Sequence, residues 1–246
     1  MNFKKYLLIS IGIFSFAISY SQNNENKNQL KFSTGYNSGA LKNLGFAPVY
    51  RYDYNGLVYK LNYERTTKKQ KLFEIQLDYL SSELKSENIP ILNADYEKIG
   101  LGISALKKVT HKNNYKLYLG LQSQTSFSVY SKKTDFDTEE NFKVNYFDFK
   151  QSFGITSKFK YQLNKKQALS TKLTLPIVLL RLSYFDANFL LLNRYQSILW
   201  NIDYRYSLSN NFDITIGYDF NYERLQVPIT FRELQYQLNL GLNYKF

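Results

Sequence analysis

The chain has 246 residues with 32 Lys and Arg, 20 Asp and Glu, a formal net charge of +12 and no cysteine. The missing cysteine excludes a disulfide framework and anchoring through a lipidated cysteine. A negative mean hydropathy of -0.41 argues against helical membrane spans, which need long uncharged runs. Because the lysines fall in short turns and on one face of the predicted strands, no nucleic-acid partner is expected.

The first predicted element is a secretory signal peptide over residues 1–21. Two lysines precede a short apolar stretch that ends at Ile18, and a small-x-small cleavage site ends at Ser21. The apolar stretch is shorter than the roughly 20 residues of a spanning helix. Residues 22–28 are then a short periplasmic segment, and residues 29–246 are one barrel domain.

Ten strand-like segments follow the signal peptide, and most reach the ~9–11 residues of a tilted transmembrane strand. They cover residues 29–37, 57–66, 72–82, 96–107, 115–130, 146–163, 168–182, 194–208, 212–223 and 234–246. The sequence therefore predicts an all-β, antiparallel up-and-down transmembrane barrel of ten strands, with eight or twelve as alternatives. A soluble sandwich or a lipocalin-like barrel is the other interpretation.

The predicted connections alternate in length along the chain. Short connections cover residues 67–71, 109–114, 164–167 and 209–211, and longer ones cover residues 38–56, 83–95, 131–145, 183–193 and 224–233. Bacterial barrels have short periplasmic turns and longer outer loops. An even number of strands puts all short connections on one side, which supports the count of ten.

The last predicted strand gives the clearest pattern of two faces. Apolar and polar residues alternate without interruption from Leu234 to Phe246. Alternation places Leu238 and Leu240 on one face and Gln237 and Asn239 on the other. Since the same pattern recurs in most segments, we expect an outer face against lipid and a polar lumen.

Charged residues on the inward face predict a network inside the lumen. The predicted members are Lys60, Glu64, Glu74, Asp78, Lys116, Asp148, Lys150, Lys158, Asp203, Arg205, Asp219 and Glu223. A barrel of about this size has little free interior, so opposite charges are expected to pair. The lining of a narrow pore and acid–base catalysis are the two alternatives.

One predicted loop invites a functional interpretation. The connection around residues 186–192 is unusually apolar and contains Phe189, Leu190, Leu191 and Leu192. It either folds into the barrel mouth as a plug or contacts a partner protein or a lipidic ligand. Upstream, Pro176 cannot donate a ladder hydrogen bond, so a bulge or a break is expected there.

Neither a metal site nor a cofactor site is predicted. The third loop carries four acidic residues between 135 and 140, but it lacks the turn glycine and fixed spacing of a calcium loop, so a solvated charged loop is favoured. The single histidine, His111, lies in a predicted turn among Lys and Asn residues. Because it has no serine and carboxylate placed to form a triad, no catalytic residue is expected.

The chain resembles the small bacterial outer-membrane β-barrel proteins, particularly those of Bacteroidota. The resemblance rests on the signal-peptide end Ser19–Gln22, the alternating last strand and the final residues Asn243–Phe246. It implies that the terminal Phe is part of the signal read by the barrel-assembly machinery. It also implies a location in the cell outer membrane, in contact with outer-membrane lipid.

These observations predict a non-enzymatic barrel with a side-chain-filled lumen. Such a barrel would act through its extracellular loops or as an accessory subunit that binds an envelope protein partner. The alternative function is a narrow channel for small polar or anionic solutes, motivated by the excess of inward lysines.

Overall fold

The fold is an all-β barrel, given by a computed structural model that describes residues 28–47, 51–67, 69–86, 92–112, 114–133, 143–183, 186–226 and 229–246. The strands within these ranges are β1 (Asn28–Asn43), β2 (Tyr52–Thr66), β3 (Lys71–Ser86), β4 (Ala94–Lys112), β5 (Tyr115–Lys133), β6 (Lys143–Gln162), β7 (Gln167–Ser183), β8 (Asp186–Leu191), β9 (Tyr195–Ser207), β10 (Phe212–Leu225) and β11 (Phe231–Lys245). None of the described residues forms a helix that is long and apolar enough to span a membrane. The predicted signal peptide lies outside the described residues.

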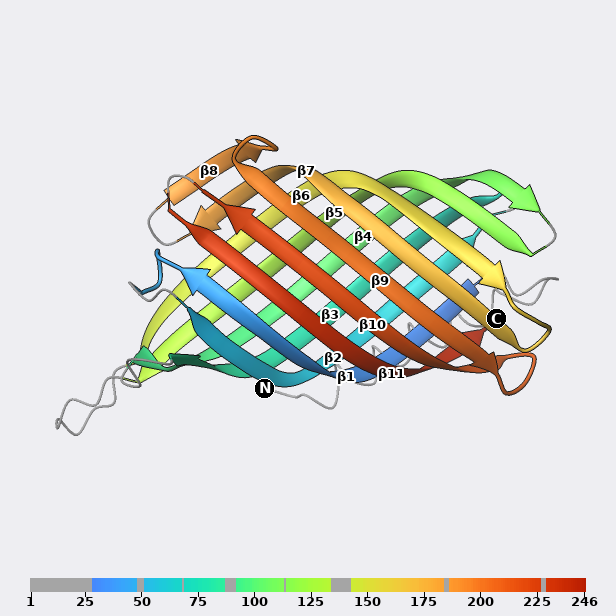
Figure 1. Ribbon diagram of the computed structural model, residues 1–246, viewed down its shortest axis with the longest axis horizontal. Coiled ribbons are helices and arrows are strands. Elements are labelled where there is room, and N and C mark those ends of the chain that lie inside the picture. Colours follow the sequence, from blue (N-terminus) through green and yellow to red (C-terminus); the bar gives the residue numbers. More distant parts are fainter. Residues whose placement is uncertain are drawn as a thin grey trace, which may run out of the picture.

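Ten of the described strands close into a tilted antiparallel barrel (Figure 1). Each strand from β1 to β7 pairs with the next, β9 pairs with both β7 and β10, and β11 pairs with both β10 and β1. The closing pair of strands is joined from Gln29 opposite Lys245 to Asn43 opposite Phe231. The predicted barrel of ten strands is confirmed, and β8 is one additional strand.

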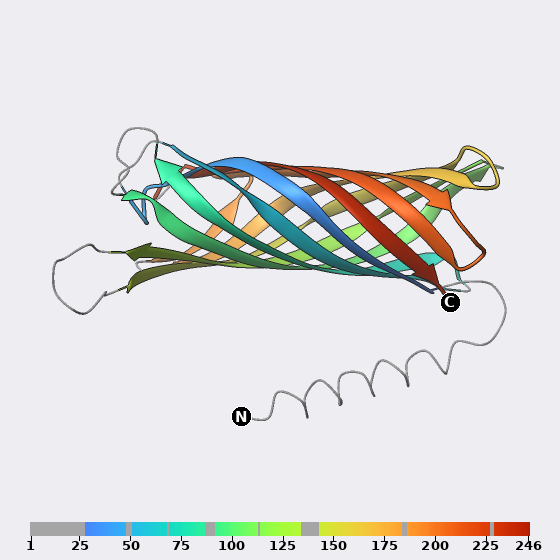
Figure 2. The ribbon, with the colours of Figure 1, turned by 90° about the horizontal axis from the view of Figure 1, so that it is seen from below.

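The connections fall at two distinct ends of the barrel. Asn28 and Phe246 exchange two backbone hydrogen bonds of 3.0 Å at one end, where both termini of the barrel lie (Figure 2). The connections from β2 to β3, β4 to β5, β6 to β7 and β9 to β10 lie at this end, which we name the turn end. The other connections lie at the opposite end, which we name the loop end.

The strands run further toward the loop end than the sequence pattern predicted. The segment predicted as loop 38–56 contains the last part of β1, which ends at Asn43, and the first part of β2, which begins at Tyr52. β11 likewise begins at Phe231. At the turn end, β4 continues to Lys112 through a register shift after Lys108. Backbone pairing with neighbouring strands extends these ends where the side chains alone resemble loops.

The two faces of β11 differ as predicted. Leu238 and Leu240 are 65% and 61% exposed, whereas Gln237 and Asn239 are 4% and 6% exposed. The apolar side chains therefore point away from the barrel and the polar ones into it. This is the reverse of a water-soluble barrel with an apolar core.

The same apolar outer face continues around the barrel. Exposed members on other strands include Phe32, Leu57, Leu77, Leu101, Leu121, Phe153, Ile155, Leu175 and Ile216. Aromatic rings pair across strands near the turn end, where the ring centroids of Phe212 and Tyr244 are 5.0 Å apart. Aromatic rings near strand ends are typical of the boundary between lipid and water.

The segment predicted as an apolar loop is in fact largely the strand β8. It lies at the upper left of Figure 1 and pairs with the end of β7, from Val178 opposite Leu191 to Ser183 opposite Asp186. The expected irregularity near Pro176 is present. The β6–β7 register shifts between Phe153 and Gly154, which leaves Ile177 without a partner in the ladder.

Candidate functional site

The lumen holds a cluster of charged residues near the turn end, which we name the turn-side cluster. Lys158 donates to Glu64 at 2.8 Å and also pairs with Glu74. Lys172 donates to the other oxygen of Glu74 at 2.6 Å, and Lys160 pairs with Glu64. Glu74 is 1% exposed. Because these residues come from β2, β3, β6 and β7, their ion pairs cross the lumen rather than follow the wall.

A second group of ion pairs links β1 and β2 to β9 and β10. Lys60 pairs with Asp219, whose Oδ2 also accepts a hydrogen bond from Asn239 at 3.0 Å. Lys31 donates to Asp203 at 2.7 Å. The two ion pairs join residues 159 and 172 positions apart in the chain, whereas Asn239 lies on β11, next to β10. The middle of the lumen is therefore crossed by side chains.

Further ion pairs lie toward the loop end. Lys98 donates to Glu233 at 2.7 Å, and the hydroxyls of Tyr54 and Tyr96 donate to the same carboxylate at 2.8 and 3.1 Å. Lys150 donates to Glu223 at 2.7 Å. A carboxylate that accepts three hydrogen bonds is well compensated for its burial.

Arg181 and Asp148 form the most completely buried pair. Nε and Nη2 of Arg181 donate to the two carboxylate oxygens of Asp148, both at 2.8 Å. The guanidinium also lies 5.0 Å from the centre of the Phe231 ring, and the ammonium of Lys150 lies 3.4 Å from it. This bidentate geometry fixes β7 against β6, and cation–π contacts hold both cations to β11.

An aromatic cluster fills the lumen at the loop end. Its members, which we name the aromatic plug, are Phe46, Tyr52, Tyr54, Tyr96, Tyr130 and Tyr146. Phe46 follows β1 and stacks on Tyr130 with ring centroids 5.0 Å apart. Tyr52, Tyr96 and Tyr130 are each 0% exposed. Inward tyrosines from several strands thus pack against a ring from the first loop and leave little room for solvent.

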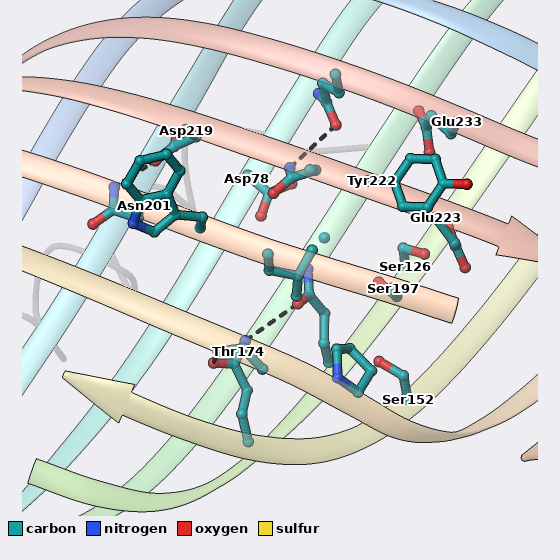
Figure 3. Close-up of a pocket in the computed structure, with 18 of the residues that line it drawn as sticks. Asp78, Ser126, Ser152, Thr174, Ser197, Asn201, Asp219, Tyr222, Glu223 and Glu233 are labelled. Atoms are coloured by element: carbon teal, nitrogen blue, oxygen red, sulfur yellow. Dashed lines mark hydrogen bonds between the residues drawn. The ribbon is translucent and has the colours of Figure 1, made fainter. Parts of the chain in front are cut away.

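A polar cavity of about 110 Å³ lies below the aromatic plug. Figure 3 shows Asp78, Ser126, Asn201, Asp219 and Glu233 around it. Four lysines and four carboxylates line this cavity, so its lining carries no net formal charge. They are Lys60, Lys98, Lys150, Lys172, Asp78, Asp219, Glu223 and Glu233.

The structure places ten of the twelve predicted network residues in ion pairs, and Asp78 and Lys116 are the two others. Lys116 is exposed at the start of β5. Asp78 lies opposite Lys60 in the β2–β3 register, but Lys60 pairs with Asp219 instead. No described residue donates to Asp78. The backbone of Gly100 lies against this carboxylate, and a Cβ there would overlap its oxygens.

Several network residues were missed by the sequence analysis. Lys31 and Lys98 lie at inward positions of β1 and β4, so the alternation along those strands could have identified them. Glu233 fell in a segment predicted as loop, and Arg181 follows the irregularity at Pro176. No sequence pattern marks these two as inward, because their strands are extended or shifted by backbone pairing.

The predicted partner residues lie at the rim of the loop end. Phe189 and Leu191 on β8 are 68% and 49% exposed, and Leu192 just after it is 54% exposed. Leu190 is only 5% exposed and packs with Leu179 in the core. Three of the four residues therefore form an exposed apolar surface, and the fourth anchors β8 to the barrel.

No group of three or more His, Cys, Asp or Glu side chains is placed to hold a metal ion among the described residues. The acidic third loop lies outside the described residues. The backbone of His111 belongs to the end of β4, opposite Lys116, rather than to a turn as predicted.

Comparisons with known proteins give a likeness of fold. No protein-family model matches the sequence, and no curated protein matches it. The outer membrane protease OmpT from Escherichia coli superposes with a TM-score of 0.61 at 10% identity, over 89% of this chain and 96% of OmpT. Neisserial surface protein A (14% identity, 88% of this chain and 97% of that one) and Ail of Yersinia pestis in complex with sucrose octasulfate (12%, 89% and 99%) each give a TM-score of 0.39. The chain has the fold of a bacterial outer-membrane β-barrel.

Proposed function

We propose that this protein is a non-enzymatic outer-membrane barrel whose lumen is closed by its own side chains. In this proposal the barrel acts at its loop end, through its loops or as an accessory subunit of an envelope assembly. One observation carries the proposal: ion pairs cross the lumen from the turn end upward, and the aromatic plug lies above them. A lumen filled in this way leaves the outer rim as the surface available for function.

The apolar outer face supports a location in lipid. Large side chains such as Leu121 and Leu238 are 68% and 65% exposed on the outside of the barrel. In water, a continuous surface of this kind would drive aggregation, whereas lipid solvates it. Cleavage of the signal peptide 1–21 and assembly in the outer membrane of a Bacteroidota-type bacterium belong to the same proposal.

The absence of enzymatic activity is proposed from the composition of the chain. A catalytic triad needs a histidine as its base, and the single histidine of this sequence, His111, lies near the turn end, away from the cavity residues. The likeness to the OmpT protease is one of fold at 10% identity and transfers no activity. A structural role for the buried charges explains why they pair, and no catalytic role is needed to account for them.

We predict that the exposed surface of β8 holds a partner protein of the envelope. The variant Phe189→Ser/Leu191→Ser/Leu192→Ser removes the three exposed apolar side chains and keeps the buried anchor. Tagged protein from gently solubilised outer membranes should recover a stoichiometric partner, and the variant should recover roughly tenfold less.

A matched control removes equally exposed apolar residues from the opposite end. Val109, Leu163 and Leu208 are 57%, 47% and 56% exposed at the turn end, so their triple serine variant should retain the partner. Equal recovery by both variants would rule out the β8 surface as the contact. A wild-type protein that comes out alone would contradict the role as an accessory subunit.

The second candidate function is a narrow channel for small polar or anionic solutes. The polar cavity of about 110 Å³ favours it, since this space could hold water or a small solute. The lack of net charge in the cavity lining argues against selection for anions. An ion current across a bilayer discriminates between a channel and a closed barrel.

A further inference from the structure

The barrel wall is interrupted between β7 and β9. β7 pairs with β9 only as far as Thr174 opposite Leu199, and its pairing with β8 begins at Val178. Residues 175–177 of β7 therefore have no ladder partner on that side among the described residues. The first four residues of β9, 195–198, pair with β10 alone. We name this place the β7–β9 interruption.

The sequence of β7 explains why the ladder stops there. Pro176 has no backbone N–H to donate, and Ile177 is the extra residue of the bulge against β6. These features turn the end of β7 away from β9 and toward β8. In a bilayer, unpaired backbone is tolerated only where it meets protein, water or a polar ligand.

The polar cavity of the lumen reaches this interruption. Pro176 and Leu179 of β7 and Tyr195, Ser197 and Leu199 of β9 all line the cavity. Figure 3 labels Ser197 of β9 and Ser152 of β6, and both residues line the cavity. The cavity is thus bordered by the one part of the β7–β9 wall that lacks backbone pairing.

The chemistry changes sharply across this place. Outside, Leu175, Ile198 and Trp200 are 46%, 39% and 40% exposed on the lipid side of β7 and β9. Pro176, Leu179 and Leu199 form an apolar border, and the deeper cavity is lined by amides, hydroxyls and paired charges. An apolar outside joined to a polar inside matches a molecule with an apolar chain and a polar head.

The cavity lining favours an uncharged head that donates hydrogen bonds. All four lysines that line the cavity already pair with carboxylates: Lys60, Lys98, Lys150 and Lys172. An anionic head would have to displace one of these carboxylates. Two acceptors of the lining lack a described donor, namely the carboxylate of Asp78 and the buried Oε1 of Gln237. Hydroxyl groups would supply those donors.

We propose that the β7–β9 interruption is a lateral entrance for a single-chain amphiphile with an uncharged, hydroxyl-bearing head. The head enters the polar cavity, and the hydrocarbon chain stays in the membrane along the outer faces of β7 and β9. Because the aromatic plug blocks the loop end, the ligand arrives from the lipid. This inference rests on the proposed membrane location and closed lumen.

The test uses the only tryptophan of the chain, Trp200, as a reporter beside the entrance. The full-length protein is placed in phosphatidylcholine nanodiscs and titrated with monoacylglycerol brominated on its chain. We expect saturable quenching of Trp200 fluorescence, reversed by unbrominated monoacylglycerol, beyond the quenching that brominated phosphatidylcholine gives at the same bromine content.

Two variants locate the binding. Ser197→Phe places a ring at the entrance and should weaken the apparent affinity roughly tenfold. Ser157→Phe makes the same change on the lipid face of β6 and should leave the affinity unchanged. If Ser197→Phe does not fold, the reversal of quenching by unbrominated monoacylglycerol in the wild type still distinguishes saturable binding from nonspecific quenching in the bilayer.

Three outcomes would overturn the inference. They are quenching that never saturates, quenching equal to that of brominated phosphatidylcholine, and tighter binding of a brominated fatty acid than of the monoacylglycerol. A failure of the proposed function gives a different signature, because a conducting barrel shows a current whether or not the amphiphile binds.

Discussion

Glu74→Gln should lower the free energy of unfolding by about 3–5 kcal/mol, the cost of leaving buried charges without their partner. Glu74 is 1% exposed and pairs with Lys158 and Lys172. Glutamine keeps the shape but removes the charge, so three lysines of the turn-side cluster would share Glu64 alone. Urea unfolding of the protein in lipid vesicles measures the difference.

Two further variants separate the charge effect from a general disturbance. Lys116 occupies a position of β5 that alternation predicts to face inward, but it is exposed and has no described ion pair. We expect Lys116→Gln to change the free energy of unfolding by no more than about 0.5 kcal/mol. Glu74→Gln/Lys172→Met removes one of the orphaned charges and should recover part of the loss. A change below about 1 kcal/mol for Glu74→Gln would mean that water solvates the cluster and that the lumen is open there.

Leu240→Lys should destabilise the barrel in a bilayer by about 2–4 kcal/mol, because it places a charge on the lipid face of β11. Leu240 is 61% exposed, so a protein in water would tolerate the same change with almost no effect. Unfolding in vesicles of phosphatidylcholine measures the cost.

Leu208→Lys is the matched control for this effect. Leu208 is 56% exposed, nearly as much as Leu240, but it lies in the connection after β9 at the turn end, where a lysine reaches water. We expect a change within about 0.5 kcal/mol. Equal effects of the two substitutions would contradict the assignment of the outer face of β11 to lipid.

Alternation of side chains predicted the fold well, because the buried and exposed faces of a strand repeat every two residues. On β11 and β10 it identified the outward Leu240 and Ile216 and the inward Asn239 and Asp219. It also gave the right number of strands in the barrel. Each of these predictions depends only on residues within one strand.

Contacts across the lumen could not be predicted in this way. Lys60 and Asp78 are opposite each other on neighbouring strands, but Lys60 reaches across to Asp219 on β10. Which strands face each other depends on the closure and tilt of the whole barrel. The aromatic plug escapes prediction for a related reason, since the sequence pattern predicts a loop over residues 38–56, whereas Tyr52 and Tyr54 belong to β2.

The strand β8 shows a third limit. Its second half enters the apolar run Phe189–Leu192, which does not alternate, and the sequence alone does not distinguish an apolar loop from a short paired strand. The structure resolves this through pairing of Leu190 with Leu179 and burial of both side chains. The same bend of β7 that allows this pairing produces the β7–β9 interruption, so one irregularity at Pro176 accounts for both features.

The most direct measurement of the closed lumen is the single-channel current of the purified full-length protein in a planar lipid bilayer. Incorporation is verified by recovering folded protein from the same membranes. With ion pairs across the lumen and the aromatic plug in place, we expect no steady conductance above that of the bare bilayer. Stable, ion-selective current steps from the wild-type protein would contradict the account and establish the narrow channel instead.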